Sequence, residues 1–180
     1  MAGGIKEGTT AYDESSLKHD KLVREASEKA YEILHKKYPD LRRHRKVEKK
    51  YFLDGIGACA PDGGAWFYRG NLIAAFEAKK QGPRGNAIER WFKNAYVLAE
   101  INSRCPLVTY AIGPGVVVDG PIWKTLYLGH QGKYNVFRDD GPSCFLKEKG
   151  FSFDEILHNM IDFVEKEMEK EMEKEIEDRF

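Results

Sequence analysis

The order in which two hydrophobic periodicities follow one another along the 180 residues is the feature that most constrains the fold. Apolar side chains that recur every three or four positions are typical of helices, and they occupy residues 13–38, 86–104 and 153–180. Apolar runs interrupted by Gly and Pro are typical of strands, and they occupy residues 51–79, 107–113 and 116–129. Segments that alternate in this way predict an α/β fold with a mixed central β-sheet flanked by helices.

The length is that of one domain, and we expect residues 1–180 to form a single one. Residues 1–12 precede the first periodic segment and are expected to be flexible. Residues 69–71, with the sequence RGN, separate two apolar runs and predict a hairpin turn. Residues 130–150 lack a clear period and are expected to be rich in loops.

Charge is distributed unevenly, although the whole chain has a net charge of zero. Residues 151–180 carry a net charge of −7, so the first 150 residues carry +7, which is compatible with a polyanionic partner. The most basic stretch, residues 41–50, is interpreted as a solvated loop, with contacts to phosphates as the alternative. The acidic helix over residues 153–180 either lies solvated on the surface or binds a partner.

The cysteines and the apolar runs bear on the cellular location. Cys59, Cys105 and Cys144 are widely spaced and odd in number, which fits neither a disulfide framework nor a CxxC metal site. We therefore expect free thiols and a cytoplasmic protein. The sequence contains no apolar run of about 18 residues, so no membrane span is predicted.

Charged residues at the end of an apolar strand are the strongest chemical signal. Glu77 and Lys79 are two positions apart, so on a strand they share a face while Ala78 points the other way. Asp62 precedes them in a Pro-Asp-Gly-Gly turn and adds a second carboxylate. Two carboxylates and a backbone carbonyl are hard oxygen ligands of the kind that Mg²⁺ accepts. An ordinary surface ion pair at a strand end is the alternative interpretation of Glu77 and Lys79.

Three short blocks follow one another here: PDGG at residues 61–64, EAKKQG at residues 77–82 and GNAIER at residues 85–90. In this order the blocks closely resemble the EcoRI-type restriction endonucleases of the PD-(D/E)XK nuclease superfamily, which carry a PDGG, an EAK-x-QG and a GNA-x-ER. The last two blocks are almost joined in this chain, whereas they lie further apart in that family. The resemblance implies a PD-(D/E)XK restriction-endonuclease-like core and the activity of a type II site-specific deoxyribonuclease.

The resemblance also implies roles for the residues of the first two blocks. Asp62 and Glu77 would bind Mg²⁺, with the carbonyl of Ala78 as a further ligand. Lys79 would act on the attacking water, so the implied catalytic residues are Asp62, Glu77 and Lys79. Gln81 follows this centre and would help to position the phosphate or the water.

The third block matches the segment that reads an A·T-rich core from the major groove in this family. Asn bonds an adenine edge bidentately, and Arg reaches acceptors on the bases. Asn86 also stands where a helix N-cap is expected, and one carboxamide cannot fully serve both purposes; the resemblance favours recognition. The residues implied to contact DNA in and around this block are Gln81, Arg84, Gly85, Asn86, Ala87 and Arg90.

Three further residues carry weaker expectations. Lys80 and Arg84 are expected to touch phosphates, with a solvated basic loop as an equal alternative. Glu28, on the first helix, is interpreted as a surface acid, with a further carboxylate near the metal as the alternative.

The family shares an AATT core, so the resemblance implies Mg²⁺-dependent cleavage of double-stranded DNA at a palindrome that contains AATT, with 5′-phosphate ends. A palindrome implies a symmetric homodimer, and a restriction enzyme implies a methyltransferase in the host that protects the same site. The six-base relatives carry arginines near a Pro-Asp-Gly turn, which aligns with residues 117–121. No arginine lies between Arg104 and Arg138, so we expect AATT itself to be the complete site.

Two other functions remain open at this point. One is a repair or junction-resolving nuclease of the same superfamily, against which the adenine-reading block argues. The other is a non-catalytic DNA-binding protein, against which the complete set of Asp62, Glu77 and Lys79 argues.

Overall fold

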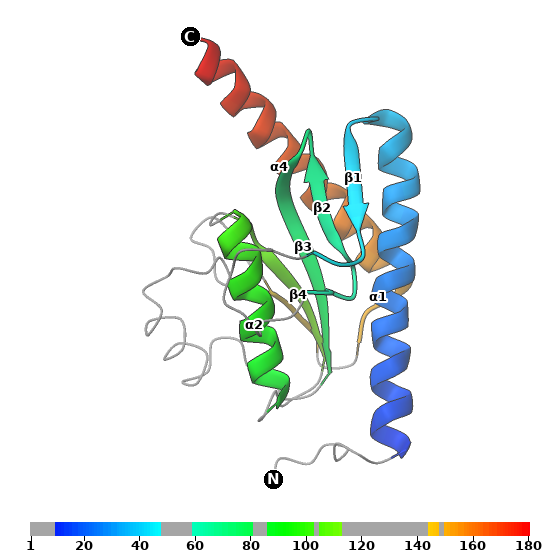
Figure 1. Ribbon diagram of the computed structural model, residues 1–180. Coiled ribbons are helices and arrows are strands. Elements are labelled where there is room, and N and C mark those ends of the chain that lie inside the picture. Colours follow the sequence, from blue (N-terminus) through cyan, green and yellow to red (C-terminus); the bar gives the residue numbers. More distant parts are fainter. Residues whose placement is uncertain (1–9, 48–58, 81–85, 103–104, 113–143, 148–149) are drawn as a thin grey trace.

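The computed structural model of the chain describes residues 10–47, 59–80, 86–102, 105–112, 144–147 and 150–180. Its elements alternate between helix and strand as the sequence predicts (Figure 1). They are α1 (Thr10–Lys37), β1 (Leu41–His44), β2 (Ala65–Tyr68), β3 (Asn71–Lys80), α2 (Asn86–Ile101), β4 (Leu107–Ile112), β5 (Cys144–Lys147) and α4 (Phe153–Arg179). The strands predicted over residues 116–129 lie outside this description, as do residues 1–9 of the segment expected to be flexible. Residues 10–12 of that segment belong to α1.

One mixed sheet of five strands, in the order β1-β2-β3-β4-β5, forms the middle of the fold. β1, β2 and β3 pair antiparallel, whereas β3, β4 and β5 pair parallel. The parallel step from β3 to β4 requires a crossover connection, and α2 supplies it. The prediction of a mixed sheet flanked by helices is therefore confirmed.

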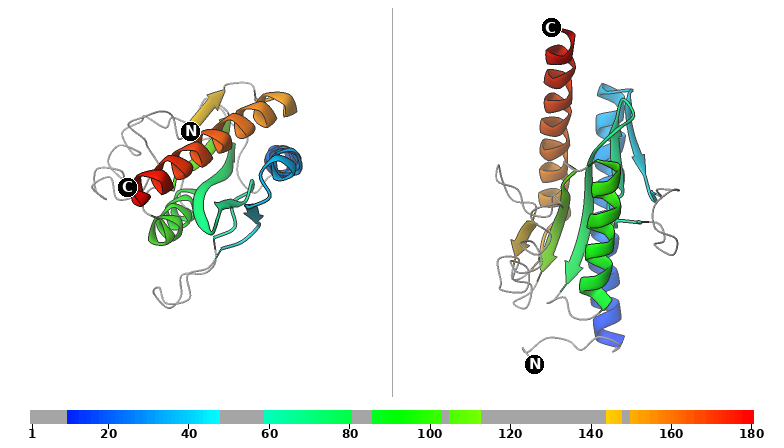
Figure 2. Two further views of the ribbon diagram at one scale, coloured as in Figure 1. Left: turned by 90° about the horizontal axis from the view of Figure 1, so that it is seen from above. Right: turned by 60° about the vertical axis from the view of Figure 1, so that its left-hand side comes forward.

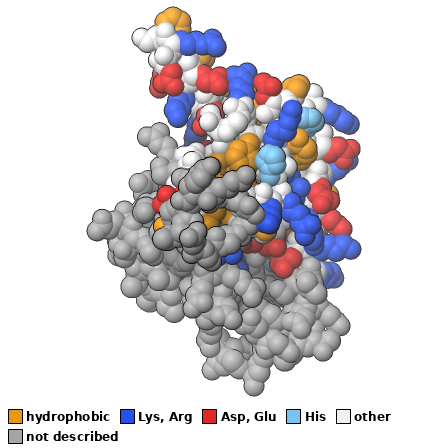
Figure 3. Space-filling view, viewed as in Figure 1, with side chains coloured by type: hydrophobic (Ala, Val, Ile, Leu, Met, Phe, Trp, Pro, Cys, Tyr) orange, Lys and Arg blue, Asp and Glu red, His pale blue; other side chains and the backbone are white. Residues whose placement is uncertain are grey.

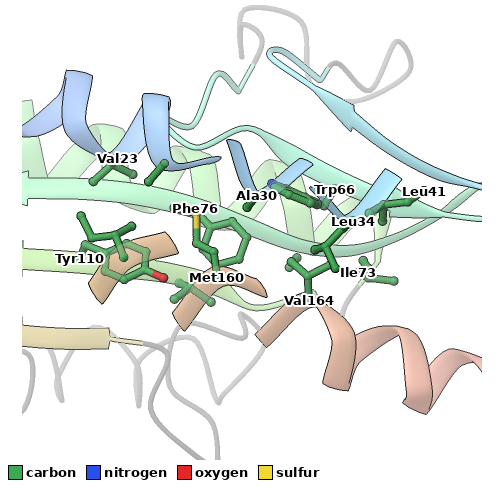
Figure 4. Close-up of a cluster of buried hydrophobic side chains, with 14 of the residues drawn as sticks. Val23, Ala30, Leu34, Leu41, Trp66, Ile73, Phe76, Tyr110, Met160 and Val164 are labelled. Carbon is green, nitrogen blue, oxygen red and sulfur yellow. The ribbon is translucent and has the colours of Figure 1, made fainter. Parts of the chain in front are cut away.

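Helices cover both faces of this sheet. α1 and α4 pack against each other and against one face, and α2 packs against the other (Figures 1 and 2). The larger buried cluster lies between the sheet and the α1–α4 pair (Figure 4), and its members include Val23, Ala30, Leu34, Trp66, Phe76, Tyr110, Met160 and Val164. Because side chains alternate along a strand, Phe76 and Ala78 of β3 belong to this cluster while Ala75 belongs to the cluster beneath α2.

The predicted hairpin turn joins β2 to β3. Tyr68 pairs with Asn71, so Arg69 and Gly70 form a two-residue loop. Both have positive φ, 51° and 85°, which is the geometry of a type I′ turn and matches the twist of the flanking strands. Arg69 is an unusual residue at positive φ. Ion pairs with Asp40, at 3.3 Å, and with Glu175 hold its guanidinium.

The ends of the two long helices follow local sequence signals. α1 ends two residues before Pro39, which disfavours helical geometry in the residue that precedes it. The hydroxyl of Ser152 accepts a hydrogen bond from the amide of Glu155, at 3.1 Å, and so caps the start of α4. Two of the predicted stripe residues are exposed instead of buried: Ile33 on α1, at 42 %, and Ile176 on α4, at 57 %.

Two predicted loops contain strands. The basic stretch over residues 41–50 begins with β1, because Leu41 is buried and the backbone pairs with β2. β5 lies within residues 130–150 and pairs with β4. Neither segment has a continuous apolar period that would predict a strand. Each forms a strand because its backbone pairs with the neighbouring strand of the sheet.

The acidic end of α4 contacts the chain's own hairpin. Glu171 accepts a hydrogen bond from the side chain of Asn71, at 3.3 Å, and Glu175 pairs with Arg69. Beyond this contact, the last turns of α4 project past the sheet (Figures 1 and 2). Among the described residues visible in Figure 3, Lys and Arg side chains alternate with Asp and Glu instead of forming one uniform patch. Among the described helices, none is long and apolar enough to cross a membrane.

Gly63 and Gly64 are required by the turn that enters β2. A Cβ atom on Gly63 would lie 2.6 Å from the Cβ of Phe76, and neither atom can rotate away. Gly64 has φ of 76°, where an L side chain is strained. The Pro-Asp-Gly-Gly sequence thus allows the turn to lie directly against β3.

We expect Gly63→Ala to lower the free energy of unfolding by about 1–3 kcal/mol, as measured by urea denaturation, because the new methyl group overpacks this contact. Gly70→Asn is the control, because nothing lies within 4 Å of a Cβ at Gly70 and Asn tolerates positive φ. The control should change the free energy by less than about 0.5 kcal/mol. Equal losses in the two variants would argue against the close approach.

Candidate active site

The turn over residues 61–64 places Asp62 opposite the end of β3. The amide of Gly64 donates to the carbonyl of Pro61, at 2.9 Å, which closes the turn. The amide of Gly63 donates to the carbonyl of Phe76, at 2.9 Å, and the amide of Phe76 donates to the carbonyl of Gly64, at 3.2 Å. These bonds continue the pairing of β2 with β3, so Asp62 comes next to Glu77 although they are 15 residues apart.

Two hydrogen bonds that involve backbone amides join Asp62 to Glu77 and Ala78. The amide of Asp62 donates to Oε1 of Glu77, at 3.3 Å, and the amide of Ala78 donates to Oδ2 of Asp62, at 3.0 Å. Glu77 is buried, with 6 % of its surface exposed, whereas Asp62 and Lys79 are half-buried. The structure therefore brings together the two carboxylates and the Ala78 backbone that the sequence predicted as one centre.

The burial of Glu77 makes its negative charge costly. Burial raises the pKa of Glu77 well above its ordinary value, and the side chain of Asp62 raises it further through a hydrogen bond and through its charge, whereas the hydrogen bond from the Asp62 amide lowers it. The ammonium group of Lys79 acts in the opposite direction. A buried acid beside a second acid is the arrangement that a bound cation would stabilise.

Asn94 of α2 is a site residue that sequence reasoning missed. Its side-chain Nδ2 donates to Oε2 of Glu77, at 2.9 Å, and its residue is 9 % exposed. Asn94 lies on the face of α2 that also carries the buried Leu98. A carboxamide within an otherwise apolar stripe was the available signal, because a buried amide needs a polar partner.

Asp20 of α1 is the second residue missed. Burial raises its pKa to about 7, and the charge of Asp62 raises it as well, while Lys79 and Arg24 oppose the shift. Asp20 is therefore the acid of α1 that shares the electrostatic environment of Asp62 and Lys79. Glu28, the acid weighed from the sequence, is exposed, in agreement with its interpretation as a surface residue. The periodicity of α1 alone does not distinguish the two acids.

The stability of the folded chain should depend on pH through Asp20. Its pKa of about 7 exceeds the model-peptide value of 3.8, so the folded state binds the extra proton between these two values. The free energy of unfolding therefore falls as the pH rises through this window. We expect Asp20→Asn to stabilise the chain at pH 8 by about 2 kcal/mol, after allowance for solvent screening.

Urea denaturation at pH 4 and at pH 8 measures this effect. The parent and Asp20→Asn should unfold nearly alike at pH 4, where Asp20 is protonated in the folded chain and about two-fifths protonated in the unfolded one. A gain of the same size at both pH values would contradict the assignment to the Asp20 charge.

The parallel strands determine where this centre lies in the fold. The carboxyl ends of β3 and β4 point to the same edge of the sheet, and α2 begins at that edge (Figures 1 and 2). In open α/β sheets, ligands bind outside the carboxyl ends of the strands. Asn86, Ala87 and Arg90 belong to the first turns of α2, although their side chains lie outside the description. Gln81, Arg84 and Gly85 lie outside it entirely.

The donor set fits a hard divalent cation. Within the described part of the chain, no three His, Cys, Asp or Glu side chains converge on one point. Mg²⁺ does not need three, because it usually keeps several waters and binds one or two carboxylates together with substrate phosphates. Asp62, Glu77 and the Ala78 carbonyl offer oxygen donors of the kind that this requirement calls for.

Thiol chemistry does not fit the same place. Cys59 and Cys105 are buried free thiols. Burial raises the pKa of Cys59 to about 12, and the charge of Glu77 adds to the shift. Since the thiolate is the nucleophile, Cys59 is inert at neutral pH.

Comparisons with protein-family models, with curated proteins and with solved structures return no match.

Proposed function

We propose that this chain is a Mg²⁺-dependent type II restriction endonuclease that cleaves double-stranded DNA, built on a PD-(D/E)XK nuclease core. The observation that carries the proposal is the pairing of Asp62 with Glu77 beside Ala78 at the carboxyl end of β3. These are the residues of the PDGG and EAK blocks. They are far apart in the chain, so their contact supports the interpretation of the two blocks as one centre.

The electrostatics support a cation at this centre. Glu77 and Asp62 lie in contact, and the burial of Glu77 disfavours a second negative charge there. A divalent cation between them would neutralise both carboxylates and lower the pKa of Glu77. When bound, Mg²⁺ would polarise the phosphodiester and make a water molecule more acidic.

The residues of the chain then have separate tasks. Asp62, Glu77 and the Ala78 carbonyl would hold the cation, and Asn94 holds the Glu77 carboxylate in place through Oε2. Lys79 lies one side-chain repeat beyond Glu77 on the same face of β3, where its ammonium group can orient the attacking water and stabilise the charge that develops on the phosphate. The water loses a proton to solvent as its oxygen bonds to phosphorus, the bond from phosphorus to the 3′ oxygen breaks, and the 3′ oxygen takes up a proton, which produces a 5′-phosphate and a 3′-hydroxyl.

Recognition is assigned to the start of α2. In this proposal Asn86, Ala87 and Arg90 read an AATT core from the major groove, with Gly85 allowing close approach of the backbone. Because α2 begins where β3 ends, bases bound there would lie near the phosphate that is cut. A second copy of the chain would read the other half of the palindrome, so the active species is a homodimer.

Digestion of a sequenced phage DNA with purified protein and Mg²⁺ tests the proposal. We expect discrete fragments whose ends all lie at AATT, whatever the flanking bases. Ends confined to one six-base sequence would contradict the four-base site. Ends without a common sequence would favour a structure-selective nuclease, and binding without any cleavage would favour a non-catalytic DNA-binding protein.

Two substitutions separate cleavage from recognition. Lys79→Ala should lower the cleavage rate on the order of 100-fold or more and leave specific DNA binding intact. Arg90→Ala should weaken specific binding by about 1–3 kcal/mol, because it removes a contact to the bases. Cleavage rates and gel-shift titrations measure these effects.

Lys36→Ala, at an exposed position in the last turn of α1, is the control for the loss of one lysine and should behave like the parent. If Lys79→Ala cuts DNA as fast as the control, Lys79 is not a catalytic residue, and the role that the resemblance of the EAK block implies for it is wrong.

A further inference from the structure

The carbonyl oxygen of Gly63, the residue after Asp62, accepts hydrogen bonds from three side chains. Ser27 of α1 donates through Oγ at 2.5 Å, Trp66 of β2 through Nε1 at 3.0 Å, and Arg43 of β1 through Nε at 3.3 Å. Arg43 Nε also donates to Ser27 Oγ, at 2.8 Å, so the donors are joined to one another. Three elements of the fold thus converge on one backbone atom.

This arrangement exceeds what a buried carbonyl requires. A single donor satisfies such a group, and most backbone carbonyls in proteins have one partner. Ser27 and Trp66 are completely buried, and Arg43 is half-buried. Burial lowers the pKa of Arg43, and the charge of Glu28 offsets this shift only in part. The Arg43 guanidinium therefore loses part of its hydration, and its Nε donates to a neutral hydroxyl and a carbonyl.

The same peptide segment is held from its other side by β3. The amide of Gly63 donates to the carbonyl of Phe76, and the amide of Phe76 donates to the carbonyl of Gly64. Gly63 is therefore held through both its N–H and its C=O group. Because Asp62 precedes it directly, the position of the Asp62 backbone relative to Glu77 depends on these bonds.

We propose that Ser27, Arg43 and Trp66 are positioning residues, which act through the Gly63 carbonyl to hold Asp62 where it and Glu77 bind one divalent cation. The inference rests on the proposed metal-dependent function, and it adds three residues that none of the sequence motifs contains. It also assigns a role to one residue of the basic stretch over residues 41–50. Arg43 of that stretch is directed inward to the site, whereas the neighbouring Arg42 and Arg45 are exposed.

The inference predicts weaker cation binding when a donor is removed. Ser27→Ala and Trp66→Phe each remove one hydrogen bond to Gly63 and retain most of the packing, and Arg43→Lys keeps the charge but loses the guanidinium Nε. We expect the dissociation constant for Mn²⁺, measured by electron paramagnetic resonance without DNA, to rise by up to about 10-fold, which is the lower end of the effect of losing a direct partner of a metal ligand, because these donors act one residue away from Asp62. The Mg²⁺ concentration for half-maximal cleavage should rise in parallel, with KM for DNA unchanged at saturating Mg²⁺.

Tyr31→Phe is the matched control. Tyr31 also lies on α1, and its hydroxyl donates to a backbone carbonyl of β1, that of Leu41, at 3.2 Å. Its loss removes the same kind of bond between the same layers but does not touch the turn of Asp62. Tyr31→Phe should bind Mn²⁺ as the parent does.

The outcomes separate this inference from the proposed function. If the parent binds Mn²⁺ or cuts DNA and the three variants are less stable but bind the cation as tightly as Tyr31→Phe, the donors are purely structural and the inference is overturned. If the parent neither binds a divalent cation nor cuts DNA, the proposed function itself is wrong, and this inference with it. Weaker binding in the three variants but not in Tyr31→Phe supports both.

Discussion

The hydrogen bond from the amide of Gly63 to the carbonyl of Phe76 is the contact on which the candidate site depends. It extends the antiparallel pairing of β2 with β3 past Ala65 and brings Asp62 opposite Glu77. The contact requires a residue without Cβ, since any side chain at position 63 would meet Phe76. The convergence of α1, β1 and β2 on the carbonyl of the same residue builds on this approach.

Because side chains alternate along β3, the residues that form the apolar core face one side of the sheet, and Glu77 of the candidate site faces the other. Phe76 and Ala78 face the apolar cluster under α1 and α4, which favours folding through the removal of apolar surface from water. Glu77 faces α2, where Asn94 is its polar partner. A buried acid next to Asp62, with Asp20 nearby, disfavours folding at neutral pH. Strained electrostatics of this kind are concentrated at functional sites, where they are retained for binding or catalysis.

Local signals were sufficient for much of the fold. The periodicity of α1, α2 and α4 and the turn at Arg69 and Gly70 were predicted, because each depends on neighbours within a few positions. β1 and β5 were not predicted, because a short strand with few apolar residues forms only against a partner strand. Ile33 and Ile176 lie on predicted stripes yet are exposed, because burial depends on which element covers the helix at that level.

For the candidate site, the sequence by itself determined which residue types are available: a glycine pair that permits a close turn, and an acid and a base on one face of a strand. Only the tertiary structure decided which of them meet. Asp20, Ser27 and Arg43 come from α1 and β1, and their sequence positions carry no sign of their role. Asn94 of α2 stands out in the sequence only as a polar residue in an apolar stripe, which does not reveal that its partner is Glu77. The physical reason is that these contacts depend on the packing of helices across the two faces of the sheet, which no local period encodes.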